Sequence, residues 1–114
     1  MKNTIMIKKN YEFKKFFSKG KFYSGENINM YIHKNNLSYN MLGIAISRKT
    51  GKAVKRNRIK RLIRENYKNF ENKIKDGTNI LIIINKKADI NKISYLDIFM
   101  DFEKILNKAD VMKN

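Results

Sequence analysis

Apolar and polar side chains alternate along residues 22–33, and alternation with a period of two is typical of a strand that buries one face. We therefore expect one half-buried strand here. The polar segment 34–38 predicts a hairpin turn, and residues 39–47 supply the partner strand. On the first strand, the side chains expected to face the core are Ile28, Met30 and Ile32, with Asn27, Asn29, Tyr31 and His33 opposite.

A period near 3.6 residues appears in two other places. Residues 10–20, NYEFKKFFSKG, predict a short helix whose phenylalanines share one side. Residues 53–74 predict a longer helix with a continuous apolar stripe on one side and a polar ridge on the other. The stripe contains Ile59, Leu62, Ile63, Tyr67, Phe70 and Ile74, and the ridge contains Asn57, Arg61, Arg64 and Lys68.

Five consecutive aliphatic residues at 80–84 predict a strand covered on both faces, as in parallel sheets. The order strand, helix, strand across residues 39–84 therefore predicts a parallel crossover unit. A last helix begins after Ser94, which can form a variant capping box with Asp97. We expect its buried face to hold Leu96, Phe99, Met100 and Leu106.

The charge changes this picture from a generic α+β domain to a binding protein. The 114 residues carry a formal net charge of +16, which attracts polyanions, so a nucleic acid is the leading partner and an anionic membrane surface the competing one. An AT-rich genome would explain many of the 21 lysines. It does not explain why all five arginines fall within residues 48–64.

We expect a single domain over residues 1–114, with residues 1–9 as a flexible basic arm and 109–114 as a tail. No apolar run is long enough to span a membrane, and no cysteine is present for a disulfide framework. A soluble cytoplasmic protein is the expectation.

Residues 48–64 contain nine cations and no carboxylate, whereas a merely solvated helix face usually mixes signs. Like charges at i, i+4 cost roughly 0.2–0.5 kcal/mol per pair, and an external polyanion would relieve that repulsion. The arginine fork can grip two phosphate oxygens and stack on bases. The helix start near residues 51–54 would add free amides and the positive end of the dipole. We therefore expect this helix to bind RNA or DNA.

Residues suited to catalysis are scarce. His33 is the one histidine, on an expected strand, and Asp89, Asp97 and Asp101 are better explained as capping and dipole partners. No spacing of histidine and acidic residues suggests a metal cage. The residues thus indicate a binding protein with no catalytic residues and no metal site of its own.

Residues 52–65, KAVKRNRIKRLIRE, resemble the signature of the bacterial ribonuclease P protein subunit. The similarity extends over about residues 11–106. FKKFFSKG resembles the family's first helix, LGIAISRKTGKAV the strand entering the signature, and NILIIINKKA the last strand. The resemblance implies an α+β fold, an α/β sandwich in the order α-β-β-β-α-β-α, with a left-handed βαβ crossover and a ribosomal-protein-S5-domain-2-like topology. It therefore implies three strands before the signature where the pattern shows two.

The same resemblance implies a function. In ribonuclease P a catalytic RNA subunit uses Mg²⁺ to remove the 5′ leader from precursor tRNA, and the protein subunit assists as part of this tRNA 5′-maturation endoribonuclease. The implied partners are the catalytic RNA and precursor tRNA, with no membrane and no obligate protein partner. The implied contacts with the catalytic RNA are Arg48, Lys49, Lys52, Arg56, Asn57, Arg58, Lys60, Arg61 and Arg64, and those with the leader are Phe13, Phe17 and Tyr31.

Other functions remain as alternatives. A ribosomal or other structural RNA-binding protein would share the charge and size but would not need aromatic residues in a cleft. A DNA-binding regulator would need a helix-turn-helix partner, and the segment before the arginine-rich helix has the pattern of a strand. A membrane-active cationic peptide would form one long amphipathic helix, which the alternating segments do not allow.

Overall fold

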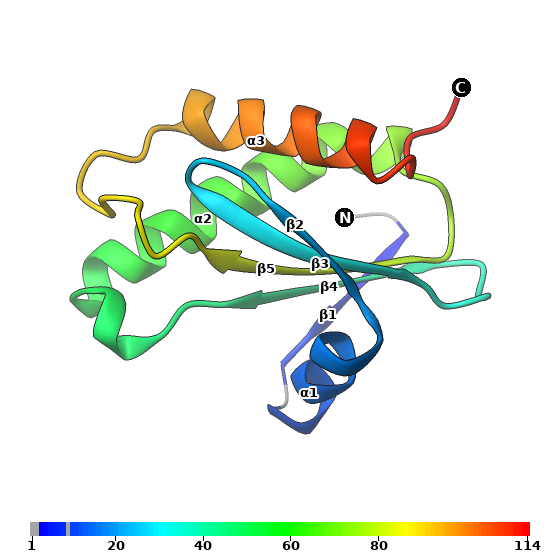
Figure 1. Ribbon diagram of the computed structural model, residues 1–114, viewed down its shortest axis with the longest axis horizontal. Coiled ribbons are helices and arrows are strands. Elements are labelled where there is room, and N and C mark those ends of the chain that lie inside the picture. Colours follow the sequence, from blue (N-terminus) through cyan, green and yellow to red (C-terminus); the bar gives the residue numbers. More distant parts are fainter. Residues whose placement is uncertain (1–2, 9) are drawn as a thin grey trace.

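The computed structural model describes residues 3–8 and 10–114, apart from the side chains of residues 10–12, 16 and 17. Its elements confirm the expected mixture of helices and strands (Figure 1). In chain order they are β1 (Thr4–Ile7), α1 (Asn10–Lys19), β2 (Lys21–Ser24), β3 (Ile28–Lys34), β4 (Asn40–Ala45), α2 (Ala53–Phe70), β5 (Thr78–Ile84) and α3 (Tyr95–Lys108), with 3₁₀ turns at Arg48–Thr50 and Glu71–Lys73.

The five strands form one sheet in the order β1-β4-β5-β3-β2. β1, β4 and β5 run parallel, and β3 and β2 are antiparallel to their neighbours. Because α2 joins the parallel neighbours β4 and β5, the predicted crossover unit is present; its hand stays a prediction. Figure 1 shows α2 and α3 on one face of the sheet and α1 on the other.

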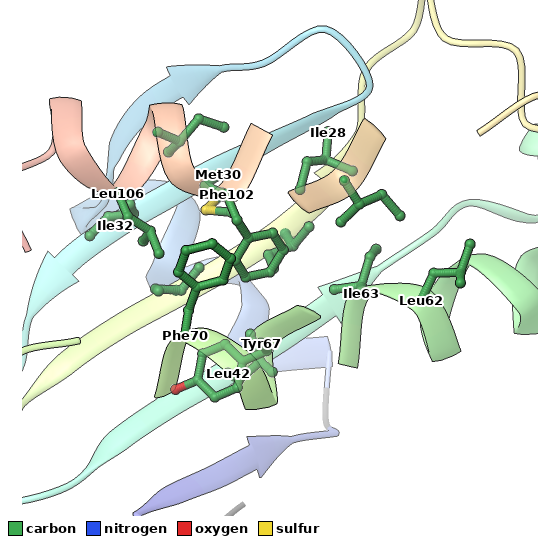
Figure 2. Packing of buried hydrophobic residues seen from close by; sticks show 14 of the residues in the cluster. Ile28, Met30, Ile32, Leu42, Leu62, Ile63, Tyr67, Phe70, Phe102 and Leu106 are labelled. Atoms are coloured by element: carbon green, nitrogen blue, oxygen red, sulfur yellow. The ribbon is translucent and has the colours of Figure 1, made fainter. Parts of the chain in front are cut away.

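The main core lies between the sheet and the helix pair α2–α3 (Figure 2). The predicted inward face of β3 is confirmed, since Ile28 and Met30 are fully buried. The predicted stripe is confirmed from Ile59 to Phe70, where α2 ends four residues earlier than predicted, and Ile74 is buried beyond the following 3₁₀ turn. Burying each such aliphatic or phenylalanine side chain contributes about 1.5–3 kcal/mol. α2 is therefore fixed in rotation by its apolar side, which determines where its polar ridge points.

A smaller cluster lies on the α1 side of the sheet, where Ile7 and Leu81 are buried and Phe13 and Tyr31 are partly buried. Gly43 on β4 permits this packing, because a Cβ there would lie 2.8 Å from Cε1 of Phe13. The short helix α1 covers only part of this face.

The single strand expected over residues 22–33 is wrong. The chain turns at residues 25–27, so that β2 and β3 form an antiparallel hairpin. The hairpin predicted at residues 34–38 is wrong as well, because β5 lies between β3 and β4 in the sheet. β2 gave no clear periodic signal because it has only four residues and three of them are exposed. The three strands before α2 that the family resemblance implied are thus present.

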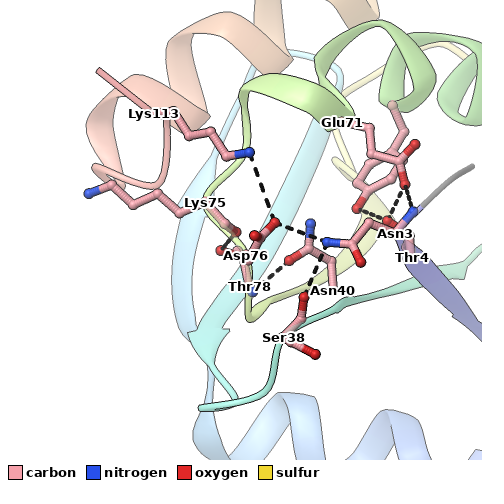
Figure 3. A network of polar contacts seen from close by, with 10 residues as sticks. Asn3, Thr4, Ser38, Asn40, Glu71, Lys75, Asp76, Thr78 and Lys113 are labelled. Carbon is pink, nitrogen blue, oxygen red and sulfur yellow. Dashed lines mark hydrogen bonds and ion pairs between the residues drawn. The ribbon is translucent and has the colours of Figure 1, made fainter.

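The flexible arm expected at residues 1–9 is wrong for residues 4–7, which form β1, while residues 1, 2 and 9 lie outside the described chain. A polar clasp holds β1 (Figure 3). The Thr4 hydroxyl donates to Oε2 of the buried Glu71 at 2.5 Å, and the Asn3 amide donates to the same oxygen at 3.2 Å. The hydroxyl of Tyr67 lies 2.8 Å from that of Thr4, and burial raises the pKa of Tyr67 to about 12. One further strand therefore precedes the predicted α-β-β-β-α-β-α order.

The expected tail at 109–114 is packed against the body of the domain. Val111 is buried, and its carbonyl accepts from the amide of Lys75 at 2.8 Å. The amide of Lys113 donates to the carbonyl of Lys73 at 2.6 Å. The C-terminal residues therefore close the core beyond the end of α3.

The start of α3 matches the prediction, and its buried face does not. Ser94 and Asp97 form the capping box with both reciprocal hydrogen bonds. Of the four residues expected to be buried, only Leu106 is; Phe99 is half-buried, and Leu96 and Met100 are 62% and 61% exposed. The helix has two apolar sides, and the one facing the sheet consists of Ile98, Phe102, Ile105 and Leu106.

Replacing Glu71 by alanine should release β1. The change leaves the Asn3 amide and Thr4 hydroxyl without their acceptor, so we expect the free energy of unfolding to fall by about 1–3 kcal/mol. Urea unfolding measures this loss, and amide exchange at residues 4–7 should accelerate. Glu103→Ala removes an exposed carboxylate from α3 and is the matched control. Equal stability of the two variants would show that the clasp does not hold the strand.

Candidate nucleic-acid interface

α2 presents most of the predicted ridge to solvent, since Asn57, Arg61 and Lys68 are exposed, and the flanking Arg58 is exposed with them. Lys52 at the start of the helix and Lys49 in the preceding turn are exposed too. Arg48 is exposed as well. The other residues predicted to contact the catalytic RNA are only partly exposed, namely Arg56, Lys60 and Arg64. The ridge therefore projects outward because the opposite side of the same helix is buried in the core.

The turn before α2 positions its first residues. Ser47 caps the 3₁₀ turn by accepting from the Lys49 amide at 3.2 Å. Nη1 of Arg56 donates to the Gly51 carbonyl at 2.5 Å, which holds that guanidinium against the loop. Lys52 makes no side-chain capping bond, and the first turn carries no acidic residue. Amides and cations thus converge at the positive end of the helix dipole, where an anion is stabilised.

Little negative charge offsets the ridge. Nε of Arg61 lies 3.9 Å from Oε1 of Glu65, and both side chains are at least half exposed, so solvent screens this pair. The other ion pairs found in the described part of the chain join Lys75 to Asp110 and Lys113 to Asp76, at the opposite end of α2. The repulsion along residues 48–64 is therefore largely uncompensated within the described molecule.

A groove of about 1060 Å³ opens between this helix and the α1 side of the sheet. Its apolar wall includes Ile7, Phe13, Ala45 and Ile83. Its cationic lining consists of Lys8, Lys49, Lys60, Arg64 and Lys86. Lys60 and Arg64 thus lie on the groove side of α2, whereas sequence reasoning had placed Arg64 on the outer ridge.

Sequence reasoning missed Lys8 and Lys86 as part of this groove. Both are single lysines among many, so composition gave no signal for either. They meet only because β1 and β5 are both parallel to β4, which brings the carboxyl ends of these strands to one edge of the sheet. A lysine within two residues of the end of β1 and of β5 is the one feature that could have suggested it.

The predicted leader-binding aromatics are distributed over the α1 side of the sheet. Phe13 lines the groove and belongs to the same partly buried cluster as Tyr31. Tyr31 lies on β3, toward the β2 edge and outside the groove lining, with its ring centroid 5.1 Å from that of Phe22. The side chain of Phe17 lies outside the described residues. The structure therefore brings two of the three predicted residues onto one sheet face.

His33 has the environment of a structural residue. Its Nε2 lies 3.1 Å from the Asn79 amide nitrogen, and burial, with a smaller effect of the Lys19 charge, lowers the pKa of His33. Within residues 3–8 and 10–114, no group of three or more His, Cys, Asp or Glu side chains could hold a metal ion. None of the helices in the described chain is long and apolar enough to cross a membrane.

Fold and surface together define a small, strongly basic α+β protein of the nucleic-acid-binding class. The family model described as Ribonuclease P matches residues 1–110. The ribonuclease P protein component of Clostridium botulinum (strain Loch Maree / Type A3) is 39% identical over 106 residues, covering 92% of this chain and 94% of the relative. The chain belongs to the family of bacterial ribonuclease P protein subunits, which confirms the resemblance in its sequence.

Solved structures agree with this assignment. The Staphylococcus aureus RNase P protein matches with a TM-score of 0.81 at 33% identity, covering 95% of this chain and 97% of that one. The RNase P protein from Thermotoga maritima matches with a TM-score of 0.80 at 27% identity, covering 91% and 96%. The fold class is therefore confirmed, and a ribosomal or other structural RNA-binding protein is not favoured.

Replacing Glu65 by glutamine should strengthen RNA binding. The change removes the carboxylate paired with Arg61 and leaves the ridge more positive. An exposed pair of this kind is worth about 0.2–1 kcal/mol, so we expect affinity for ribonuclease P RNA to rise roughly 1.5- to 5-fold at low salt. Filter binding measures the change, with Glu103→Gln on α3 as the matched control. A weaker or unchanged affinity in Glu65→Gln would argue against a contact between this ridge and RNA.

Proposed function

We propose that the protein acts in ribonuclease P through two separate surfaces. The outer ridge of α2 and the turn before it bind the catalytic RNA, and the aromatic sheet face with its groove binds the single-stranded 5′ leader. Membership of the family makes the chain the protein subunit of the endoribonuclease that removes the 5′ leader of precursor tRNA. The proposal concerns which residues carry that role.

The uncompensated positive charge of α2 supports its proposed contact with the catalytic RNA, because the buried side of this helix fixes its rotation. Ile59 and Ile63 are fully buried, so Arg58 and Arg61 must face outward. A large folded RNA presents a dense array of phosphates, and arginine forks bind such oxygens in pairs. Binding would relieve the repulsion that the free protein retains.

Two features support the second part. Phe13 and Tyr31 lie on one sheet face, and bases of a single strand stack on aromatic faces with ~1–3 kcal/mol each. Lys60, Arg64 and Lys86 border the adjoining groove, where they can contact the phosphates of the same strand. Phe17 belongs to this proposal only through the resemblance of residues 13–20 to the family's first helix.

Catalysis in this proposal belongs to the RNA subunit, as it does throughout the family. Mg²⁺ would be held mainly by RNA, because the donor set of the described residues contains no cluster suited to a metal. The protein needs no obligate protein partner and no membrane for this role. We place the complex in the cytoplasm, where bacterial tRNA precursors are made.

The two surfaces should be separable by mutation. Arg58→Ala combined with Arg61→Ala should weaken assembly with the catalytic RNA whether or not tRNA is present. Tyr31→Ala should spare assembly and lower the affinity of the complex for precursor tRNA by roughly 1–3 kcal/mol, because one stack is lost. Mature tRNA has no leader, so its affinity should hardly change. The measurement is the ratio of precursor to mature tRNA affinity in the reconstituted complex.

A matched control for the ridge is Lys104→Ala with Lys108→Ala, which removes two exposed cations from α3. If this control weakens assembly as much as the ridge variant, net charge rather than the ridge determines binding. If folded Tyr31→Ala keeps the wild-type affinity ratio, the leader runs elsewhere. Failure of the wild-type protein to support tRNA processing by the catalytic RNA at low magnesium would contradict the whole proposal.

A further inference from the structure

Phe22 is an exposed aromatic residue beside the proposed leader surface. It lies on β2, the edge strand of the sheet, and 48% of it is exposed. The register pairs it with Tyr31, and the two ring centroids are 5.1 Å apart. Directly paired residues of antiparallel strands point to the same face. Phe22 therefore extends the aromatic surface of Tyr31 to the open edge of the sheet.

Neighbouring residues agree with this orientation. Tyr23, the next residue of β2, packs against the main core on the opposite face, as strand alternation requires. Single exposed apolar side chains are ordinary on protein surfaces, so the exposure of Phe22 alone indicates nothing. Its continuity with a second ring that the proposed function already uses is what makes it informative.

The hairpin that carries both rings is held firmly at its turn. The buried carboxylate of Asp101 accepts from the amides of Glu26 at 3.1 Å, Asn27 at 2.8 Å and Ile28 at 3.0 Å. Nδ2 of Asn85 donates to the Gly25 carbonyl at 2.8 Å. α3 and the segment after β5 therefore both fix the turn. A rigid aromatic pair loses little conformational freedom when it binds a base, which favours affinity.

The angle between the rings of Phe22 and Tyr31 determines how many bases can stack on them. The ring planes are inclined by 59°, so one flat base cannot lie parallel to both. Each ring therefore has its own stacking direction, and neighbouring nucleotides of one strand would use them in turn. Lys19, the last residue of α1, is exposed just before β2, where it can contact a phosphate of such a strand. Aromatic faces beside cations are the features that bind single-stranded RNA.

We infer that Phe22 forms an additional stacking site for one base of the single-stranded leader, next to the base that Tyr31 holds. This inference rests on the proposed function, because it takes the Tyr31 face as the leader path. It adds a contact at the sheet edge to the leader contacts that the family resemblance implies.

The test uses the reconstituted complex of protein and catalytic RNA, with precursor tRNAs whose leaders lengthen by one nucleotide at a time. Phe22→Ala should weaken binding of long-leader precursors about fivefold or more, the effect of losing a stack of ~1 kcal/mol. Phe22→Leu should lose as much, since it keeps an apolar side chain without the ring, and Phe22→Trp should retain binding. The effects of Phe22→Ala and Tyr31→Ala should set in at two successive leader lengths. Mature tRNA should bind all variants alike.

A comparison with the double variant shows whether Phe22 stacks on a base itself or only holds the Tyr31 ring in position. If Phe22 contacts a base itself, Phe22→Ala should still weaken long-leader binding when Tyr31 is already alanine. No further loss in that background would overturn the inference. Leu96→Ala, which truncates an exposed apolar side chain on α3, is the matched control and should change nothing.

The possible outcomes distinguish this inference from the proposed function. If Tyr31→Ala lowers the ratio of precursor to mature affinity and Phe22→Ala and Phe22→Leu do not, the leader surface stands and the Phe22 site is wrong. If Tyr31→Ala has no effect either, the leader assignment itself fails. Circular dichroism checks that each variant folds. If Phe22→Ala loosens the edge strand, the affinity of Phe22→Leu for long-leader precursors decides the test instead.

Discussion

The packing of α2 on the sheet is the interaction on which the rest of the structure depends. Its apolar stripe buries Ile59, Ile63 and Tyr67 completely, and that burial is what holds a helix rich in mutually repelling cations in place. Because the stripe fixes the rotation of the helix, it directs Arg58 and Arg61 outward and turns Lys60 and Arg64 toward the groove. A hydrophobic contact thus determines the geometry of an electrostatic surface.

The two faces of the sheet differ in how completely they are covered. The face under α2 and α3 is closed and supplies stability, with Ile80 and Ile82 of β5 fully buried there. The face under α1 is only partly covered, because a ten-residue helix cannot span five strands. In the proposed function, the half-buried aromatic residues at this face, Phe13 of α1 and Tyr31 of β3, stack on bases of the leader. The same sheet therefore supplies the core on one face and the proposed binding surface on the other.

Sequence periodicity predicted the elements that bury one side continuously. The α2 stripe, the inward face of β3 and the Ser94–Asp97 cap were all predicted, because each depends on residues close in sequence. β1 could not be predicted, since its anchor Glu71 lies 67 residues from Thr4. The buried side of α3 was predicted wrongly because this helix has apolar residues on two sides. The groove was missed because Lys8 and Lys86 meet only through the parallel pairing of β1, β4 and β5.

The most direct test of the ridge as an RNA-binding surface is the salt dependence of affinity for ribonuclease P RNA. If about six phosphate contacts form, log affinity should fall with log salt at a slope near −4 to −5. Arg58→Ala with Arg61→Ala should make that slope shallower by roughly one unit per lost contact, whereas Lys104→Ala with Lys108→Ala should leave it unchanged. A wild-type slope near zero, or a ridge variant with the wild-type slope, would contradict the assignment of this helix to the catalytic RNA.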